Sequence, residues 1–96
     1  MTSKERAYLK GLAMSIDPVL NVGKGSITPE FIRAVDEAIE KRELIKLSVL
    51  KNCMDDPRAI AETVAERTNS QVVQVIGKKI VLYRKNKKNP KIMPSK

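Results

Sequence analysis

Two short sequences, Thr28-Pro29 and Asp56-Pro57, strongly limit how this chain can fold. Threonine and aspartate are good helix N-caps, and proline fits the first helical position because an amide hydrogen would have no acceptor there. Each pair therefore predicts the start of a helix. The sequence Thr-Ser-Lys-Glu at residues 2–5 matches a capping box, which predicts another helix from about residue 3.

The segments between these helix starts have the spacing of β-strands. From Leu44 to Leu50 apolar and polar residues alternate, with Ile45, Leu47 and Val49 pointing to one side, as expected for a half-buried strand. Further strands are predicted at residues 19–22, 71–76 and 80–84. The last two flank residues 77–79, a glycine-containing connection that suits a hairpin.

The order of these elements is helix, strand, helix, strand, helix, strand, strand. It predicts a single α/β (α+β) domain over residues 1–84, with a mixed four-stranded sheet and packed helices. Residues 85–96 have no apolar periodicity and contain two prolines, so we expect a basic flexible tail there. The second and third helices share one face if both strand connections advance in the same direction, but the sequence does not give the strand order.

The residue types present exclude several kinds of active site. The chain has no histidine, which excludes histidine-based nucleophile activation and histidine-ligated metals. Cys53 is the single cysteine, so it has no partner for an internal disulfide and is expected to be a small buried residue. Carboxylates such as Asp36 and Glu40 have basic neighbours at helical spacing, so we expect them to form ion pairs on the surface and not a catalytic or metal site. We expect a non-enzymatic protein with no cofactor or metal.

The charge is distributed unevenly along the chain. Residues 1–76 contain eleven basic and eleven acidic residues, whereas residues 77–96 contain eight basic residues and no acidic one, so this last segment accounts for the net charge of +8. This asymmetry favours a polyanionic partner, with nucleic acid ahead of an anionic membrane. The alternative is a solubilising tail without a partner. The N-terminus has no apolar run long enough for a signal peptide, so we expect a cytoplasmic protein.

A glycine-rich corner, Gly23-Lys24-Gly25-Ser26, lies between the first predicted strand and the helix capped by Thr28. Glycines let a backbone approach an anion closely, and the amides and dipole of a helix start favour negative charge. Such a corner could hold a phosphate, or its glycines could serve only to turn the chain. It lacks the full pattern of a P-loop or of a dinucleotide-binding fingerprint.

Three runs of sequence resemble one known family. They are residues 20–28 (LNVGKGSIT), 42–47 (RELIKL) and 73–84 (VQVIGKKIVLYR). Together they are similar to the CRM domain, the chloroplast RNA splicing and ribosome maturation module, and above all to the bacterial stand-alone YhbY family. The resemblance implies a fold like that of the C-terminal domain of translation initiation factor three.

The resemblance also implies a function. In this family a Gly-x-x-Gly loop is similar to the loop by which KH domains clamp an RNA backbone, and it maps onto residues 23–26, with Ser26 in place of the last glycine. We expect Ser26 to have a negative φ and its hydroxyl to be able to donate to a phosphate. The stand-alone members are associated with the precursor of the large ribosomal subunit, which implies ribosomal RNA as the partner.

The candidate RNA-binding residues combine this loop with the exposed cations expected around it. They are Gly23, Lys24, Gly25, Ser26, Thr28, Arg6, Lys10, Lys78, Lys79, Arg84, Lys85, Lys87 and Lys88. Tyr8 and Phe31 lie on apolar helix faces and are expected in the core, while the ring of Tyr83 could pack with its hydroxyl in water. With so few aromatic residues, contact with the RNA backbone is favoured over base stacking.

Three hypotheses for the function follow. The leading one is a monomeric, non-enzymatic protein that binds ribosomal RNA and assists maturation of the large subunit. A second is a protein-interaction module that docks on a ribosomal protein, and a third is a chromatin-like DNA-binding protein. Charge alone does not separate RNA from DNA.

Overall fold

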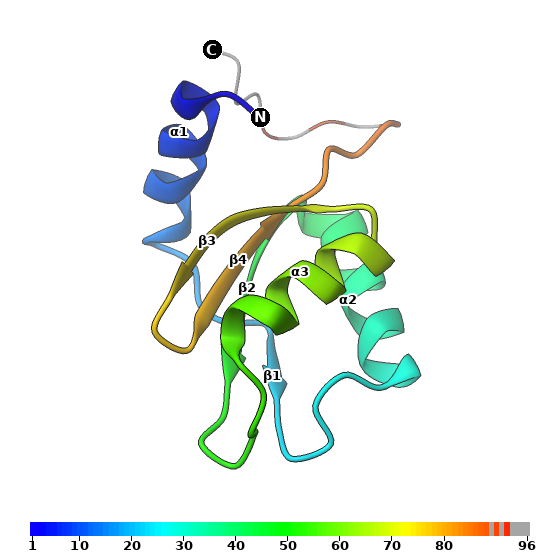
Figure 1. Cartoon of the computed structure of the whole chain (residues 1–96). Coiled ribbons are helices and arrows are strands. Elements are labelled where there is room, and N and C mark those ends of the chain that lie inside the picture. The colour runs from blue at the N-terminus through cyan, green and yellow to red at the C-terminus, as the bar shows by residue number, and fades with distance from the viewer. Residues whose placement is uncertain (89, 91, 93–96) are drawn as a thin grey trace.

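The computed structural model describes residues 1–88, 90 and 92 (Figure 1). The secondary structure elements, in chain order, are α1 (Ser3–Ala13), β1 (Leu20–Val22), α2 (Pro29–Arg42), β2 (Leu44–Val49), α3 (Pro57–Arg67), β3 (Gln71–Ile76) and β4 (Lys79–Tyr83). The predicted order is confirmed. β4 begins at Lys79, one residue earlier than predicted, because Gly77, with a φ of 56°, and Lys78 are enough to turn the hairpin. The strand ends at Tyr83, before Arg84.

All three helices begin at the predicted N-caps. The side chains of Thr2 and Thr28 each accept from a first-turn amide at 3.1 Å, and that of Asp56 accepts at 3.2 Å. Glu5 completes the capping box by accepting from the Thr2 amide at 2.8 Å. This backbone hydrogen bond lowers the pKa of Glu5, because it favours the charged carboxylate.

The four strands form one mixed sheet in the order β1-β2-β4-β3. β1 pairs with β2 in parallel, whereas β2 with β4 and β3 with β4 are antiparallel. This confirms the predicted fold class and supplies the strand order. Since β1 and β2 are parallel neighbours, α2 is the crossover that joins them.

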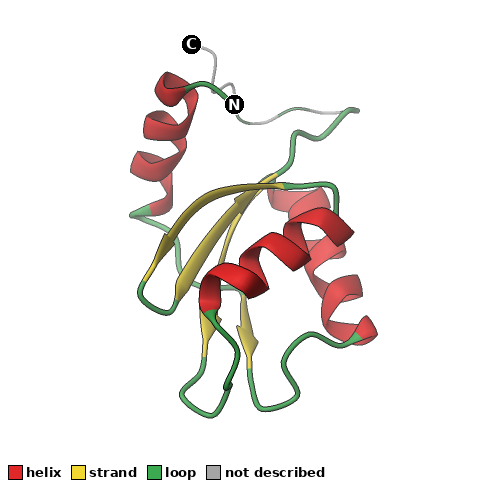
Figure 2. Ribbon diagram, viewed as in Figure 1, coloured by secondary structure: helices red, strands yellow, loops and turns green. Residues whose placement is uncertain are grey.

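The helices divide between the two faces of the sheet (Figure 2). α2 and α3 cover one face, where residues such as Val35, Ile39 and Ile60 meet the inward side chains of β2 and β4 in the larger apolar cluster. α1 lies on the other face and forms a smaller cluster in which Leu9 packs with Leu44. The second and third helices therefore share a face, as they do when both connections advance in one direction.

The aromatic residues differ in part from expectation. Tyr8 is 45% exposed, so its predicted place in the core is wrong. Phe31 packs against the larger cluster. Tyr83 is buried, and among the described residues its hydroxyl has no hydrogen-bond partner. Burial raises the pKa of Tyr83, because it disfavours the charged phenolate.

Part of the C-terminal segment, for which a flexible tail is predicted from residue 85, contacts the folded body. The carboxylate of the fully buried Glu43 accepts from the amides of Asn86 and Ile92, both at 2.7 Å. The Ile92 side chain packs against the smaller apolar cluster. Local periodicity could not reveal these contacts, since the two segments lie more than forty residues apart. Lys91 and Lys96 of the expected tail lie outside the described residues.

The unpartnered hydroxyl gives a prediction for Tyr83→Phe. A buried polar group without a hydrogen bond costs about 1–3 kcal/mol, so its removal should leave the free energy of unfolding unchanged or raise it by about 1 kcal/mol. The raised pKa means that wild-type stability falls as pH rises above about 10, and the variant should escape this fall. Urea unfolding at pH 7 and pH 10.5 measures both. A variant clearly less stable at pH 7 would show that the hydroxyl has a partner.

Candidate nucleic-acid interface

Two loops lie side by side at one end of the sheet (Figure 1). Because β1 and β2 are parallel, the glycine loop after β1 and the loop of residues 50–55 after β2 leave from the same edge. The Leu50 amide donates to the Val22 carbonyl at 2.8 Å. A Cβ at Gly23 would lie 3.7 Å from Leu50 Cδ1, which shows how closely the loops approach.

The conformation of Ser26 differs from the expectation. Its φ is 54°, so the expected negative φ is wrong, and Gly25 is not the left-handed residue of the loop. The Ser26 amide donates to the Gly23 carbonyl at 2.9 Å, which closes a tight turn that ends in the left-handed region. Its hydroxyl hydrogen-bonds to the carboxylate of Asp55 in the neighbouring loop. The Ser26 hydroxyl, which was expected to donate to a phosphate, is therefore already bonded to Asp55.

The start of α2 offers fewer free amides than expected. Pro29 has no amide hydrogen, the Phe31 amide donates to Thr28 Oγ1 at 3.1 Å, and the Ile32 amide donates to the Thr28 carbonyl at 3.0 Å. Thr28 is thus occupied as the helix cap. An anion at this corner would depend mainly on Lys24 and the exposed backbone of the loop.

The hairpin turn between β3 and β4 lies at the same end of the sheet. The Val49 amide, at the end of β2, donates to the Lys78 carbonyl at 2.7 Å. Lys78 and Lys79 are both exposed, and Lys79 Nζ donates to Ser48 Oγ at 2.8 Å. The structure thus brings together the glycine loop and two lysines that lie more than fifty residues away in the sequence. We call these loops and this turn (residues 23–28, 50–55 and 77–79) the loop end.

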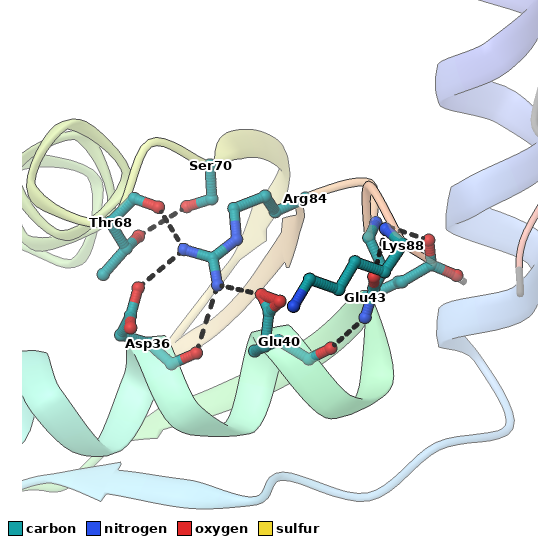
Figure 3. Close-up of polar contacts among 8 residues, drawn as sticks. Asp36, Glu40, Glu43, Thr68, Ser70, Arg84 and Lys88 are labelled. Atoms are coloured by element: carbon teal, nitrogen blue, oxygen red, sulfur yellow. Dashed lines mark hydrogen bonds and ion pairs between the residues drawn. The ribbon is translucent and has the colours of Figure 1, made fainter. Parts of the chain in front are cut away.

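Arg84 lies at the opposite end of the sheet and has structural partners (Figure 3). Its guanidinium contacts Asp36 Oδ1 at 2.6 Å and Glu40 Oε2 at 3.1 Å, and it donates to the Thr68 carbonyl at 2.7 Å. Arg84 thereby connects the end of β4 to α2 and to the C-terminus of α3 through these contacts. The exposed Lys85, Lys87 and Lys88 follow at this far end, away from the glycine loop.

Arg6 also has structural partners, which are neutral carbonyl groups. Its Nη1 donates to the carbonyls of Val72 and Val73, both at 2.8 Å, where a bulge interrupts the pairing of β3. A bulge leaves carbonyl groups without ladder partners, and the arginine satisfies two of them. Lys10, one turn further along α1, is exposed.

The sequence analysis missed the loop that follows β2. Lys51 and Asn52 are exposed there, and Met54 is 93% exposed. The loop has no glycine pattern to mark it, and the only available signal was its place after a strand parallel to β1. Across the described ranges there is no cluster of three or more potential metal ligands. In the same part of the chain no helix has the length and apolar character that crossing a bilayer requires.

Comparison with known proteins identifies the family. The model of the CRS1/YhbY (CRM) domain matches residues 1–84. The chain belongs to the CRM family. It is 42% identical over 92 residues to the Bacillus subtilis "Probable RNA-binding protein YqeI", covering 96% of each chain. It is 29% identical over 96 residues to an RNA-binding protein of Haemophilus influenzae, covering 100% of this chain and 97% of that one.

A solved structure agrees with the CRM fold. The solution structure of a Staphylococcus aureus protein, described as "a putative RNA binding protein", superposes with a TM-score of 0.82 at 47% sequence identity. The match covers 97% of both chains. The resemblance inferred from the three sequence runs is therefore confirmed.

The left-handed φ of Ser26 gives a prediction for Ser26→Gly. A non-glycine residue in this region costs roughly 1–2 kcal/mol, and Ser26→Gly removes this cost while losing the hydrogen bond to Asp55 and adding unfolded-state entropy. We expect a net gain in stability of about 0.5 kcal/mol. Ser26→Ala is the control, since it keeps the strain and loses the hydroxyl, and it should be less stable than wild type. Thermal melts of the wild type and both variants measure this order. A lower melting temperature for Ser26→Gly than for Ser26→Ala would contradict the strain at Ser26.

Proposed function

We propose that this CRM protein binds RNA through its loop end. The observation that supports this best is the convergence of the glycine loop, the loop of residues 50–55 and the Lys78–Lys79 turn at one end of the sheet. Lys24, Lys51, Lys78 and Lys79 supply four exposed cations there. The relatives from Bacillus subtilis and Haemophilus influenzae carry RNA-binding names, which agrees with this function.

The contacts proposed at the loop end are to the sugar–phosphate backbone. Lysine ammonium groups and close-lying backbone are suited to phosphates, whereas base stacking needs exposed aromatic rings. Tyr8 is the one aromatic residue more than one-third exposed in the described part of the chain, and it lies on α1, away from the glycine loop. Asp55 bonds to Ser26 within the loop pair, and its negative charge offsets part of the attraction for phosphate.

We further propose that the RNA is ribosomal and that the protein assists maturation of the large subunit as a monomeric, non-enzymatic cytoplasmic factor. The support is the resemblance to the stand-alone YhbY members, which are associated with the precursor of that subunit. Local positive charge at the loop end would attract any polyanion, so the choice of ribosomal RNA must come from its folded shape.

Crosslinking in cells tests both parts of this proposal. The wild type, Lys24→Glu and Lys87→Glu are crosslinked to RNA, and the attached fragments are sequenced. Both variants change the charge equally, but Lys24 lies in the glycine loop and Lys87 at the opposite end of the sheet. We expect wild-type fragments to map to large-subunit ribosomal RNA and Lys24→Glu to recover about tenfold less RNA, because it adds repulsion and removes a phosphate contact.

Lys87→Glu should lose clearly less, and the melting temperatures should match, because both lysines are exposed. Equal recovery by wild type and Lys24→Glu would contradict binding at the loop end. Fragments spread over messenger RNAs without ribosomal enrichment would contradict the ribosomal assignment alone. Recovery of DNA or a ribosomal protein in place of RNA would favour one of the other two hypotheses.

A further inference from the structure

The sheet face that carries α1 is covered over only part of its extent. α1 packs on the half that contains Leu44, Val73, Val81 and Tyr83, and the helix ends at Ala13. The next residue, Met14, is 85% exposed. The other half of this face, toward the loop end, therefore has no helix over it.

The strand register shows which side chains lie on this uncovered half and at its border with α1. Ser48 pairs with Lys79 and Lys79 with Ile76, which gives one row across the sheet. Lys46 pairs with Val81 and Val81 with Gln74, which gives a second row. Directly paired residues point to the same face. Lys79 and Ile76 are exposed and Lys46 and Gln74 are half-buried, so basic, polar and apolar side chains form an open patch here, unlike the apolar face beneath α2 and α3.

A groove runs along this patch beside the end of α1. Its lining includes Lys10 from α1, Lys46 from β2 and Lys79 from β4, together with Met14, Gln74 and Ile76. No aspartate or glutamate is among the described residues that line it. Three lysines therefore line one groove without a carboxylate among its described lining. Ser48 holds one of them, Lys79 Nζ, at 2.8 Å.

The positive charge continues around the edge of the sheet. A second hollow along β3 is lined by Lys10, by Arg6 and by Arg58 of α3, again with no acidic residue among its described lining. In the other direction Lys79 is shared with the loop end, where it adjoins Lys78. The groove is thus continuous with the surface already proposed to bind RNA.

We propose that this groove binds a single-stranded stretch of the same RNA that the loop end contacts. Lys10, Lys46 and Lys79 contact its phosphates, and the bases lie against the aliphatic side chains of Met14 and Ile76. A single strand exposes base faces and edges to such a surface, whereas a duplex hides the faces in its stack. The Gln74 amide can donate to and accept from a base edge. The inference rests on the proposed RNA binding and adds the path and form of the bound strand.

The test uses two double variants with equal loss of charge, and it leaves Lys79 unchanged because that lysine also belongs to the loop end. The groove variant is Lys10→Gln/Lys46→Gln, and the control is Lys4→Gln/Arg42→Gln, which changes exposed cations at the opposite end of the molecule. Affinity for fluorescent oligouridylate, and for an RNA duplex of equal charge, is measured against salt. Two lost phosphate contacts should flatten the single-strand plot of log affinity against log salt by about 1.4, and the control should flatten it far less.

The outcomes separate this inference from the proposed function. The proposed groove is overturned if the groove variant and the control give the same slope of log affinity against log salt for the single strand. It is also overturned if the groove variant weakens binding of the duplex alone. If Lys24→Glu loses binding while the groove variant does not, the groove fails and the loop end stands. If neither variant loses affinity, the proposed function fails as well. An acidic peptide that binds wild type but not the groove variant, with RNA affinity unchanged, would assign the groove to a protein partner.

A second measurement uses the unaltered protein, so that the proposal can be tested even if the groove variant does not fold. Wild-type protein is photocrosslinked to an oligonucleotide that carries 4-thiouridine, and the modified peptides are identified by mass spectrometry. Adducts at Met14, Gln74 or Ile76 are expected. Adducts confined to residues 23–26 and 50–55 would overturn the groove.

Discussion

Parallel pairing of β1 with β2 is the constraint on which the proposed interface depends. It forces the chain to cross back through α2, so both strands end at the same edge and their following loops lie together. β4 then pairs antiparallel with β2, which brings the Lys78–Lys79 turn to that edge. Three segments that are far apart in the sequence thereby share one end of the molecule. The same arrangement sends Arg84 and the residues after it to the other end.

Basic residues in this protein serve two different purposes. Arg6 and Arg84 use their planar guanidinium groups to satisfy several carbonyls and carboxylates at once, which suits them to join elements of the fold. Several exposed lysines instead present their charge to the solvent, as at Lys24 and Lys78. Much of the uncompensated charge in the sequence is thus available to a partner, but it is divided between the two ends of the sheet.

The local features of the fold could be predicted from the sequence, and the long-range ones could not. The helix starts at Thr28-Pro29 and Asp56-Pro57 depend only on a cap and a proline next to each other in the sequence, and both are confirmed. The strand order, the clamp of Glu43 on Asn86 and Ile92, and the ion pairs of Arg84 join segments far apart in the sequence. Ser26 shows the same limit, since its left-handed φ accompanies a contact with Asp55 in another loop. The family resemblance located the glycine loop but not the loop of residues 50–55 beside it.

The most direct test of RNA binding at the loop end is an NMR titration of the ¹⁵N-labelled full chain with a fragment of large-subunit ribosomal RNA. The chemical shifts of amides report contact along the whole backbone without any substitution. We predict that the largest changes fall at residues 23–26, 50–55 and 77–79, with extension into β4 where the groove begins. Changes confined to residues 84–88 and the C-terminal ends of α2 and α3 would contradict the account, since binding would then lie at the opposite end of the sheet.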